Sequence, residues 1–320
     1  MKLVVVQLSD IHIKTSSDVI LRRTKEIAIA IKNVAPTADA YLLAITGDVA
    51  YSGTKDQYAF AAQFVIALMD ELKAIGKPVF EFVIPGNHDA DFSQQLDTRE
   101  ALLQYVRKNL DKIDPSGEIV RQILSVQKNF FEFEALLIRT AERPTNERIA
   151  YSYNFVVAGH TVRARCFNTA WVSTNPESPG TLVFPCNLIA GDLEAADIEI
   201  AAFHHPRNWL TPDNSRAFKI AVESSVDLIM TGHEHEMSTY QKRDMDTGNT
   251  QHVEGAVLQE SDSARSAFNI IAIDHQSEKY EVYACTWAHD RYAPASTGEY
   301  PFIRNKLARK GIFHNISSEE

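Results

Sequence analysis

Aspartate, histidine and asparagine side chains gather at the ends of five short apolar runs in this 320-residue sequence. The residues concerned are Asp10 and His12, Asp48, Asn87, His88 and Asp89, His204 and His205, and His233 and His235. Carboxylate, imidazole and amide groups together suit borderline divalent ions such as Mn²⁺, Fe²⁺, Co²⁺, Ni²⁺ or Zn²⁺. So many ligands exceed the needs of one ion but suit two ions that share a carboxylate. Paired metals of this kind clamp the attacking and leaving oxygens of a phosphoryl transfer.

The spacing of two pairs favours convergence on a common point. One residue separates Asp10 from His12, and one residue separates His233 from His235. In extended chain, residues i and i+2 face the same side, so we expect each pair to reach one centre while the intervening residue points away. Glycine precedes the first candidate ligand in three of the runs, at Gly47, Gly86 and Gly232. A residue without Cβ lets the backbone turn sharply there.

The elements that must position these side chains begin with alternating strands and helices. Apolar runs at 3–8, 41–46 and 79–84 predict buried strands, and the segments 18–34 and 55–76 have helical periodicity. Buried strands separated by helices indicate βαβ units and a largely parallel sheet. Ligands of open α/β sheets bind beyond the carboxyl ends of the strands. The candidate residues are therefore expected at one shared edge.

The rest of the chain reads as a helical segment followed by more strands. Residues from about 92 to 150 are polar and helical in pattern, with 96–110 and 118–142 as the best segments. Further strands are predicted at 150–158, 161–170, 198–203, 226–230, 252–258, 268–274 and 279–285. We expect the N-terminal βαβ units to form one sheet and the strands from 151 onward to contribute to the other.

Five ordered motifs carry a resemblance to a known family. They are DIH at 10–12, GDVAYSG at 47–53, GNHD at 86–89, HH at 204–205 and GHEH at 232–235. Together they resemble the calcineurin-like metallophosphoesterases over about residues 1–285. The resemblance implies a four-layer αββα sandwich in which residues 92–150 form a helical insertion or cap. It also implies a catalytic domain over 1–290, with 291–320 as a C-terminal extension or linker.

The resemblance assigns a role to each motif residue. One ion would be held by Asp10, His12 and His235, the other by Asn87, His204 and His233, with Asp48 as the bridge. We expect manganese, with iron, nickel, cobalt or zinc as alternatives. Water whose pKa is lowered by the metals would be the nucleophile. His88 would be the general acid that protonates the leaving alcohol, oriented by Asp89 or a nearby group, although Asp89 is equally explained as a loop cap.

The substrate class remains open at the motif level. The family's protein phosphatases carry Asp-Arg-Gly where this chain has Tyr51-Ser52-Gly53, and its repair nucleases carry a histidine in place of Tyr51. The HHP sequence at 204–206 resembles bacterial cyclic-nucleotide phosphodiesterases more closely, although those enzymes often carry an aspartate at the position of Tyr51. Beside it, Arg207 is a candidate phosphate contact and Trp209 a candidate base-stacking residue, while His205 is expected to face substrate or support a ligand. Packing beneath the loop is the simpler explanation of Trp209.

Three functions follow from these observations. The first is a dinuclear phosphodiesterase acting on a cyclic nucleotide or a similarly small diester. The second is a nuclease acting on DNA or RNA, which needs a basic channel that a chain of net charge −10 does not display. The third is a non-catalytic scaffold, for which missing ligands would be the sign, and here none is missing.

Composition bears on the compartment. The three cysteines, Cys166, Cys186 and Cys285, are far apart and odd in number, which is typical of reduced intracellular thiols. The N-terminal apolar run is too short for a secretory signal, and no run is long enough to cross a bilayer. We therefore expect a cytoplasmic protein without a membrane segment. The basic-then-acidic stretch at 304–320 is either a frayed helix or a linker to a further domain or partner.

Overall fold

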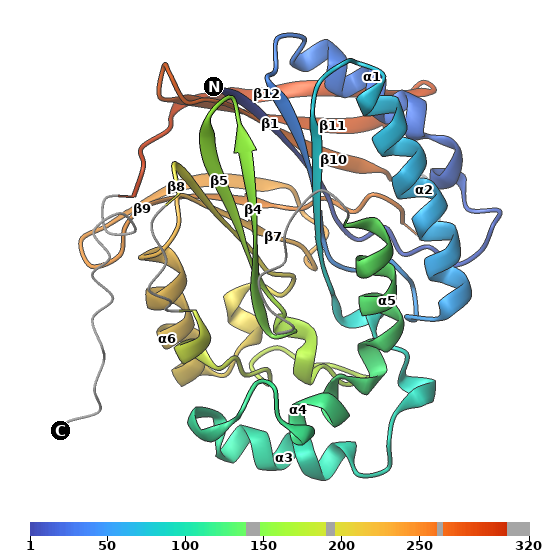
Figure 1. The fold of residues 1–320 in the computed structure, drawn as a ribbon, viewed down its shortest axis with the longest axis vertical. Helices are drawn as coiled ribbons and strands as arrows, with labels where there is room; N and C mark the ends of the chain where they lie inside the picture. The colour runs from blue at the N-terminus through green and yellow to red at the C-terminus, as the bar shows by residue number, and fades with distance from the viewer. Residues whose placement is uncertain (139–147, 190–195, 261–264, 306–320) are drawn as a thin grey trace.

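Two six-stranded sheets form the centre of the computed structural model, which describes residues 1–138, 148–189, 196–260 and 265–305 (Figure 1). The first sheet has the strand order β12-β11-β10-β1-β2-β3. Its strands are β1 Lys2–Leu8, β2 Ala40–Thr46, β3 Val79–Ile84, β10 Ala267–Asp274, β11 Lys279–Ala288 and β12 Arg291–Pro301. The second has the order β4-β5-β6-β7-β9-β8. Its strands are β4 Ala150–Val157, β5 His160–Phe167, β6 Ile198–Ala202, β7 Leu228–Thr231, β8 Ser238–Asp244 and β9 Gly248–Glu254.

Strand β1 lies in the middle of the first sheet and has a different kind of neighbour on each side. It pairs in parallel with β2, where Leu3 lies opposite Ala40, and antiparallel with β10, where Lys2 lies opposite Asp274. All of β1 after Lys2 is buried, as is the whole of β2. Strands buried on both faces favour apolar residues at nearly every position, which explains why these segments are almost continuous apolar runs, with Gln7 and Thr46 as the polar exceptions.

The distribution of the later strands differs from the sequence expectation. The strands from 151 onward are expected to contribute to the second sheet, and β4 to β9 form it, but β10, β11 and β12 join the first. Since β1 has an edge that β2 does not cover, the antiparallel strands complete its backbone hydrogen bonding. The second sheet contains a parallel centre, β5-β6-β7-β9, with antiparallel strands β4 and β8 at its edges.

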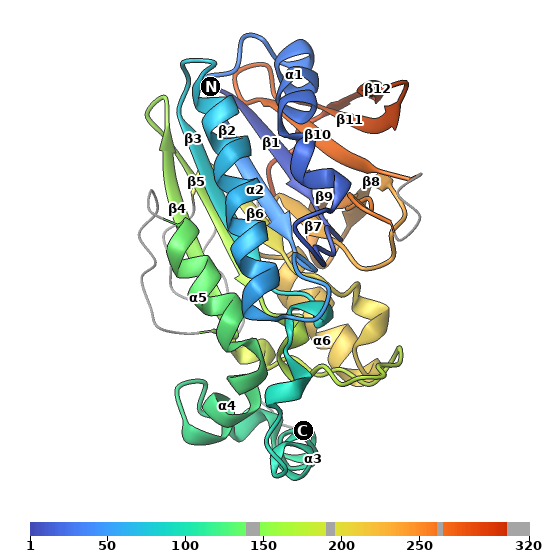
Figure 2. The ribbon, with the colours of Figure 1, turned by 90° about the vertical axis from the view of Figure 1, so that its right-hand side faces the viewer.

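Helices cover the outer face of each sheet, which confirms the expected four-layer α/β sandwich. Over the first sheet lie α1, α2 and α5, and Figure 2 shows α1 and α2 side by side in front of it. Over the second lie α6 and several short 3-10 helices. The α-helices are α1 Thr24–Val34, α2 Lys55–Lys73, α3 Arg99–Lys108, α4 Glu118–Ile123, α5 Lys128–Leu137 and α6 Pro212–Glu223. The 3-10 helices are Val19–Arg22, Asn87–Asp89, Phe92–Gln94, Leu110–Lys112, Leu124–Gln127, Thr169–Val172, Cys186–Leu188 and Arg207–Trp209.

The helical insertion expected at 92–150 has two different parts. Its last helix, α5, packs with α2 in the outer layer of the first sheet through Phe130, Phe131 and Phe133. Helices α3 and α4 lie at the end of the molecule, where they share an apolar cluster with Trp171 and Phe184 (Figure 1). Part of the expected cap is therefore a structural layer of the sandwich, and residues 139–147 lie outside the described part.

The end of the expected catalytic domain also lies further along the chain than residue 290. Strand β12 pairs with β11, and Asn305 is fully buried, with a side chain that donates hydrogen bonds to the carbonyl oxygens of Glu223 and Thr247. Residues 291–305 are therefore part of the sandwich, and 306–320 lie outside the described residues. Among the described helices, none combines the length and the apolar character that a bilayer crossing requires.

Candidate dinuclear metal centre

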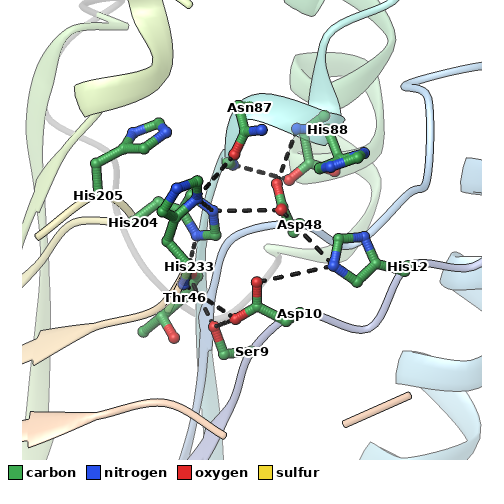
Figure 3. A network of polar contacts seen from close by, with 12 residues as sticks. Ser9, Asp10, His12, Thr46, Asp48, Asn87, His88, His204, His205 and His233 are labelled. Carbon is green, nitrogen blue, oxygen red and sulfur yellow. Dashed lines mark hydrogen bonds and ion pairs between the residues drawn. The ribbon is translucent and has the colours of Figure 1, made fainter. Parts of the chain in front are cut away.

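The carboxyl ends of five strands meet at one place between the two sheets. Strands β1, β2 and β3 bring Asp10, Asp48 and Asn87 from the first sheet, and β6 and β7 bring His204 and His233 from the second. Figure 3 shows these side chains pointing toward one another. The expected shared edge is therefore present.

The backbone at this edge adopts an unusual conformation. Five candidate residues have positive φ angles of 50–77°, namely Asp10, His12, Asp48, His233 and His235. An L-residue other than glycine rarely occupies this region, at a cost on the order of 1 kcal/mol or more for each residue, and such residues cluster at functional sites. The expectation that the paired ligands share one face of an extended strand is wrong, because β1 ends at Leu8 and β7 at Thr231. Left-handed turns beyond the strands bring them together instead.

The first ligand set surrounds Oδ1 of Asp10. This oxygen lies 3.2 Å from Nε2 of His235 and 3.8 Å from Nε2 of His12. The two imidazole nitrogens are 3.5 Å from each other. Oδ1 of Asp10 is buried without a hydrogen-bond donor among the described residues, which is costly unless a cation occupies the space it faces.

The second ligand set contains two imidazoles and an amide. Nδ1 of His233 lies 3.3 Å from Nε2 of His204 and 3.1 Å from Oδ1 of Asn87. His204 is fully buried. These three groups and the first set are oxygen and nitrogen donors of the kind that borderline divalent ions take, so the residues present fit a pair of such ions.

Asp48 stands between the two sets. Its Oδ2 is 3.8 Å from Nε2 of His12 in the first set and 3.3 Å from Nε2 of His204 in the second. Its other oxygen, Oδ1, accepts a hydrogen bond of 2.9 Å from the backbone N–H of His88. One carboxylate oxygen therefore faces both sets, while the other is fixed by the backbone.

Outer groups leave the ligand atoms of Asp10 and His204 available. Oδ2 of Asp10 accepts hydrogen bonds from the hydroxyl of Ser9 at 2.6 Å and from the backbone N–H of His233 at 3.1 Å, so Oδ1 is the oxygen left over. Nδ1 of His204 donates to the carbonyl oxygen of Thr46 at 2.9 Å, which leaves Nε2 for a metal. Such partners fix the orientation and tautomer of metal ligands. Ser9 and Thr46 were not singled out from the sequence, although each directly neighbours a motif.

The histidines of the cluster have pKa values that are shifted in opposite directions. Burial, together with nearby imidazoles, lowers the pKa of His233 to about 2, and burial also lowers the pKa of His12. Burial alone would lower the pKa of His204, but the Asp48 carboxylate raises it to about 10. The protonated His204 ring therefore compensates the negative charge of the buried Asp48 carboxylate. Binding of a metal ion by these two residues would release that proton.

His88 and Asp89 have separate environments. Nδ1 of His88 donates to the carbonyl oxygen of Tyr51 at 2.7 Å, so Tyr51 and not Asp89 orients the ring. The fully buried Asp89 carboxylate instead accepts hydrogen bonds from the backbone N–H groups of Val49, Ala50 and Gly86 and from the hydroxyl of Tyr58. Of the two alternatives for the group that orients His88, the contacts favour a nearby group, Tyr51, over Asp89, and the alternative of a loop cap describes the contacts of Asp89.

His205 and its surroundings lie behind the second ligand set. Its Nε2 donates to Oε2 of Glu177 at 2.9 Å, and its Nδ1 lies 3.1 Å from the hydroxyl of Thr169, so both ring nitrogens have protein partners. The Trp209 ring packs against the His233 ring with centroids 4.1 Å apart, and its Nε1 donates to Glu234 at 2.7 Å. Trp209 thus packs against a candidate metal ligand, and His205 is buried away from solvent.

Two cavities flank the centre. One of about 380 Å³ opens beside the first ligand set and is lined by His12, Lys14, Ser17, Asp18, Val19, Tyr51, His88, His235, Gln259 and Glu260. The other, of about 270 Å³, includes Arg207, Tyr240 and His252 among its lining residues but none of the metal-ligand candidates. Arg207 therefore lines a different cavity from the one beside His88, which we call the groove. Lys14, whose Nζ lies 4.1 Å from the Tyr51 ring centroid, was missed although it lies two residues after His12.

Comparisons with known proteins bear on the family. The family model described as calcineurin-like phosphoesterase matches residues 3–237. No curated protein matched the chain. Solved structures that are similar include a dimetal phosphatase from Danio rerio, at 12% identity and a TM-score of 0.48, with 92% of this chain and 99% of that chain covered. The Plasmodium inner-membrane-complex anchor GAP50 has 14% identity, a TM-score of 0.45 and coverages of 97% and 93%. Vacuolar protein sorting 29 from Cryptosporidium parvum has 11% identity, a TM-score of 0.39 and coverages of 94% and 98%.

Proposed function

Because the chain belongs to the calcineurin-like phosphoesterase family, we propose that it is a dinuclear metal-dependent phosphodiesterase of a cyclic nucleotide or a similarly small diester. Metal-dependent phosphoester hydrolysis is the general activity of that family. The single observation that carries the proposal is Asp48, whose Oδ2 lies between two sets of nitrogen and oxygen donors. A single carboxylate oxygen that faces both sets would suit two ions, for which we favour manganese.

In the proposed site, Asp10, His12, His235 and Asp48 would hold one ion, and Asp48, Asn87, His204 and His233 would hold the other. The bound ions would supply an activated water nucleophile and would neutralise the charge that develops on the phosphoryl oxygens. Ser9 and Thr46 keep the ligand atoms of Asp10 and His204 turned inward. The protein's part is thus to fix the ligands before substrate arrives.

His88 is the residue that we assign to the leaving group. Since Nδ1 donates to the Tyr51 carbonyl, Nε2 is the nitrogen that can hold a proton for the departing alcohol oxygen. The His88 ring lies 4.7 Å from the His12 ring, centroid to centroid, beside the first ligand set and along the groove wall. The backbone N–H of His88 also donates a hydrogen bond to Asp48, which holds the loop that carries His88 next to the proposed bridging carboxylate.

The groove supports a small substrate. Its volume of about 380 Å³ is within the usual range for small-molecule sites. The exposed ring of Tyr51 and the ammonium group of Lys14 offer a face for a base and a charge for a phosphate. Asp18 and Glu260 also line it, and such acidic groups repel an extended polyanion. These features favour a small diester over a nucleic-acid chain.

A substrate panel tests this proposal. The chelator-treated protein is reloaded with manganese and assayed on 3′,5′- and 2′,3′-cyclic nucleotides, single-stranded DNA, RNA, a bis-nitrophenyl diester and a nitrophenyl monoester. Asp48→Asn, purified in the same way, controls for contaminating phosphatases. We expect hydrolysis of cyclic nucleotides to be the fastest reaction and to be absent from the control. Faster cleavage of DNA or RNA would indicate a nuclease, and two bound ions without any hydrolysis would indicate a scaffold.

A further inference from the structure

A second cluster of metal-ligand side chains lies at the opposite end of the sandwich from the dinuclear centre. His160 is the first residue of β5, Asp197 directly precedes β6, and His275 directly follows β10. One potential ligand atom from each lies within 4.8 Å of the other two. The cluster therefore draws on both sheets, two residues from the second and one from the first.

Strand β1 sets the separation between the two centres. The backbone N–H of His275 donates to the carbonyl oxygen of Met1 at 2.9 Å, so the new cluster lies at the start of β1, whereas Asp10 follows its end. At about 3.3 Å per residue, a strand of this length places the two sites on the order of 20 Å apart. The cluster is therefore independent of the phosphoesterase residues.

The geometry of the cluster is close to what a tetrahedral ion requires. Nδ1 of His160 lies 3.6 Å from Oδ2 of Asp197, and the rings of His160 and His275 have centroids 4.6 Å apart. Two ligands on bonds of about 2.0–2.1 Å at a tetrahedral angle are separated by about 3.3 Å. Small side-chain rotations would thus bring all three donors to one ion.

The carboxylate of this cluster is already oriented. Oδ2 of Asp197 accepts hydrogen bonds from the backbone N–H of Thr161 at 2.8 Å and from its hydroxyl at 3.2 Å. The hydroxyl of Thr161 also accepts from the backbone N–H of Asp197 at 3.0 Å. This is the arrangement by which outer groups hold metal-ligating carboxylates in place.

We propose that His160, Asp197 and His275 bind a single borderline divalent ion, for which Zn²⁺ has the best-suited ligand set. Two imidazoles and one carboxylate are a common protein contribution to zinc, with water completing the coordination. The side chains of His160 and Asp197 are 36% and 38% exposed, so an ion and its water have access from solvent. The bound ion ties the starts of β5 and β6 to the turn after β10 and acts as a brace between the sheets.

Arg304 is the competitor for this site. Its Nη1 lies 3.5 Å from Nε2 of His275, and its Nη2 lies 3.4 Å from Oε1 of Glu278. A guanidinium beside an imidazole opposes the arrival of a second cation, whereas Glu278 gives Arg304 another position to occupy. Removal of Arg304 therefore increases the affinity of the site for zinc.

Zinc counting tests the proposal on the full chain. Chelator-treated wild type, His160→Gln and His275→Gln are dialysed against the same micromolar-range free zinc and analysed for bound metal. We expect each variant to bind one ion fewer than wild type, while His252→Gln, the matched histidine control, keeps the wild-type count. Since bound ligand stabilises the native state, zinc should also raise the melting temperature of wild type more than that of His160→Gln.

The same measurement separates this site from the phosphoesterase centre. In an Asp48→Asn, His204→Ala background, zinc binding that depends on His160 and His275 should persist, with or without any hydrolytic activity. Arg304→Gln should lower the dissociation constant of this ion. Equal zinc counts in wild type, His160→Gln and His275→Gln would overturn the proposal and leave the cluster as a surface ion pair. Unchanged zinc affinity in Arg304→Gln would show that Arg304 does not compete with zinc for this site.

Discussion

The backbone N–H of His88 donates a hydrogen bond of 2.9 Å to Oδ1 of Asp48. This contact joins the loop after β3 to the carboxylate that stands between the two ligand sets. Because Oδ1 is held in this way, Oδ2 remains turned toward both His12 and His204. Movement of either loop would therefore disturb the proposed acid and the proposed bridge together.

Asp48→Asn should lose both metal ions and the activity together. An amide lacks the charge that two cations share, and its NH₂ group would repel them. Loss of an outer-shell partner typically lowers metal affinity by about 10–100-fold, so loss of the bridge should exceed that range. Elemental analysis after dialysis, with the exposed Asp70→Asn as control, measures the effect. Near-full occupancy by two ions in Asp48→Asn would show that Asp48 is not the bridging ligand.

His88→Ala should keep both ions but lose rate by roughly 10²–10⁴-fold on diesters with alkyl alcohol leaving groups, the usual effect of one acid–base group. The loss should shrink for nitrophenyl diesters, because their phenolate departs without a proton. Turnover numbers across a series of leaving groups, with metal content determined in parallel, provide the measurement. A uniform loss across the series, or loss of a metal, would make His88 a structural residue or a ligand.

Gly86→Ala should weaken metal binding although the backbone can accept the change. The φ angle of Gly86 is −103°, which alanine adopts without strain, but a Cβ there would lie 2.1 Å from Oδ1 of Asp48. Asp48 must move, so we expect activity and metal affinity to fall by about 10-fold or more. Gly117→Ala is the control, because its φ of −72° also suits alanine and the Cβ would lie no closer than 3.1 Å to the atoms of the exposed Asp114. An unchanged metal affinity in Gly86→Ala would show that Asp48 can shift without consequence.

Asp89→Ala should destabilise the fold. It would leave three buried backbone N–H groups, those of Val49, Ala50 and Gly86, without their acceptor, and the Tyr58 hydroxyl would keep only the backbone carbonyl oxygen of residue 89. We expect a loss of about 3–5 kcal/mol in the free energy of unfolding, which is typical of a broken buried charged network. Urea unfolding of the metal-free protein measures it. A change below about 1 kcal/mol would contradict this role.

His252 should contribute to acid sensitivity. Burial lowers its pKa to about 4, from an ordinary value of 6.5, so the unfolded chain binds the extra proton first as the pH falls. The free energy of unfolding should thus decrease between pH 6.5 and pH 4, by up to about 3 kcal/mol from this residue. His252→Gln should remove that part of the slope in urea unfolding, whereas the exposed His289→Asn should not. Identical slopes in wild type and His252→Gln would refute the assignment.

The sequence was sufficient for the fold class and for the meeting of the ligands. Continuous apolar runs predicted β1, β2 and β3 because these strands are buried on both faces, and their polar ends predicted the shared edge. The family match over residues 3–237 confirms the resemblance that the motifs carried. The sequence therefore predicts those elements whose burial requires apolar residues at consecutive positions.

Other features depend on contacts that no local pattern encodes. Strand β8 has no buried face, since all its residues are intermediate or exposed, so it lacks an alternating pattern. The placement of β10 beside β1 is a long-range pairing. Likewise, the role of Asp89 depends on N–H groups supplied by a distant loop, and the left-handed turns at the ligands are set by tertiary contacts.

The pairing of β1 with β10 has a consequence for the order in which this chain can fold. On a ribosome, β1 leaves the exit tunnel first, and most of the chain must be made before β10 follows, which takes about 10–50 s at ordinary synthesis rates. During that interval one edge of a largely apolar strand, which is buried at every position after Lys2 in the folded protein, has no partner. The nascent chain therefore needs protection from aggregation. The loop that carries Asp10, whose carbonyl oxygen accepts hydrogen bonds from the backbone N–H groups of Leu258 and Gln259, can close only after those two residues have been synthesised.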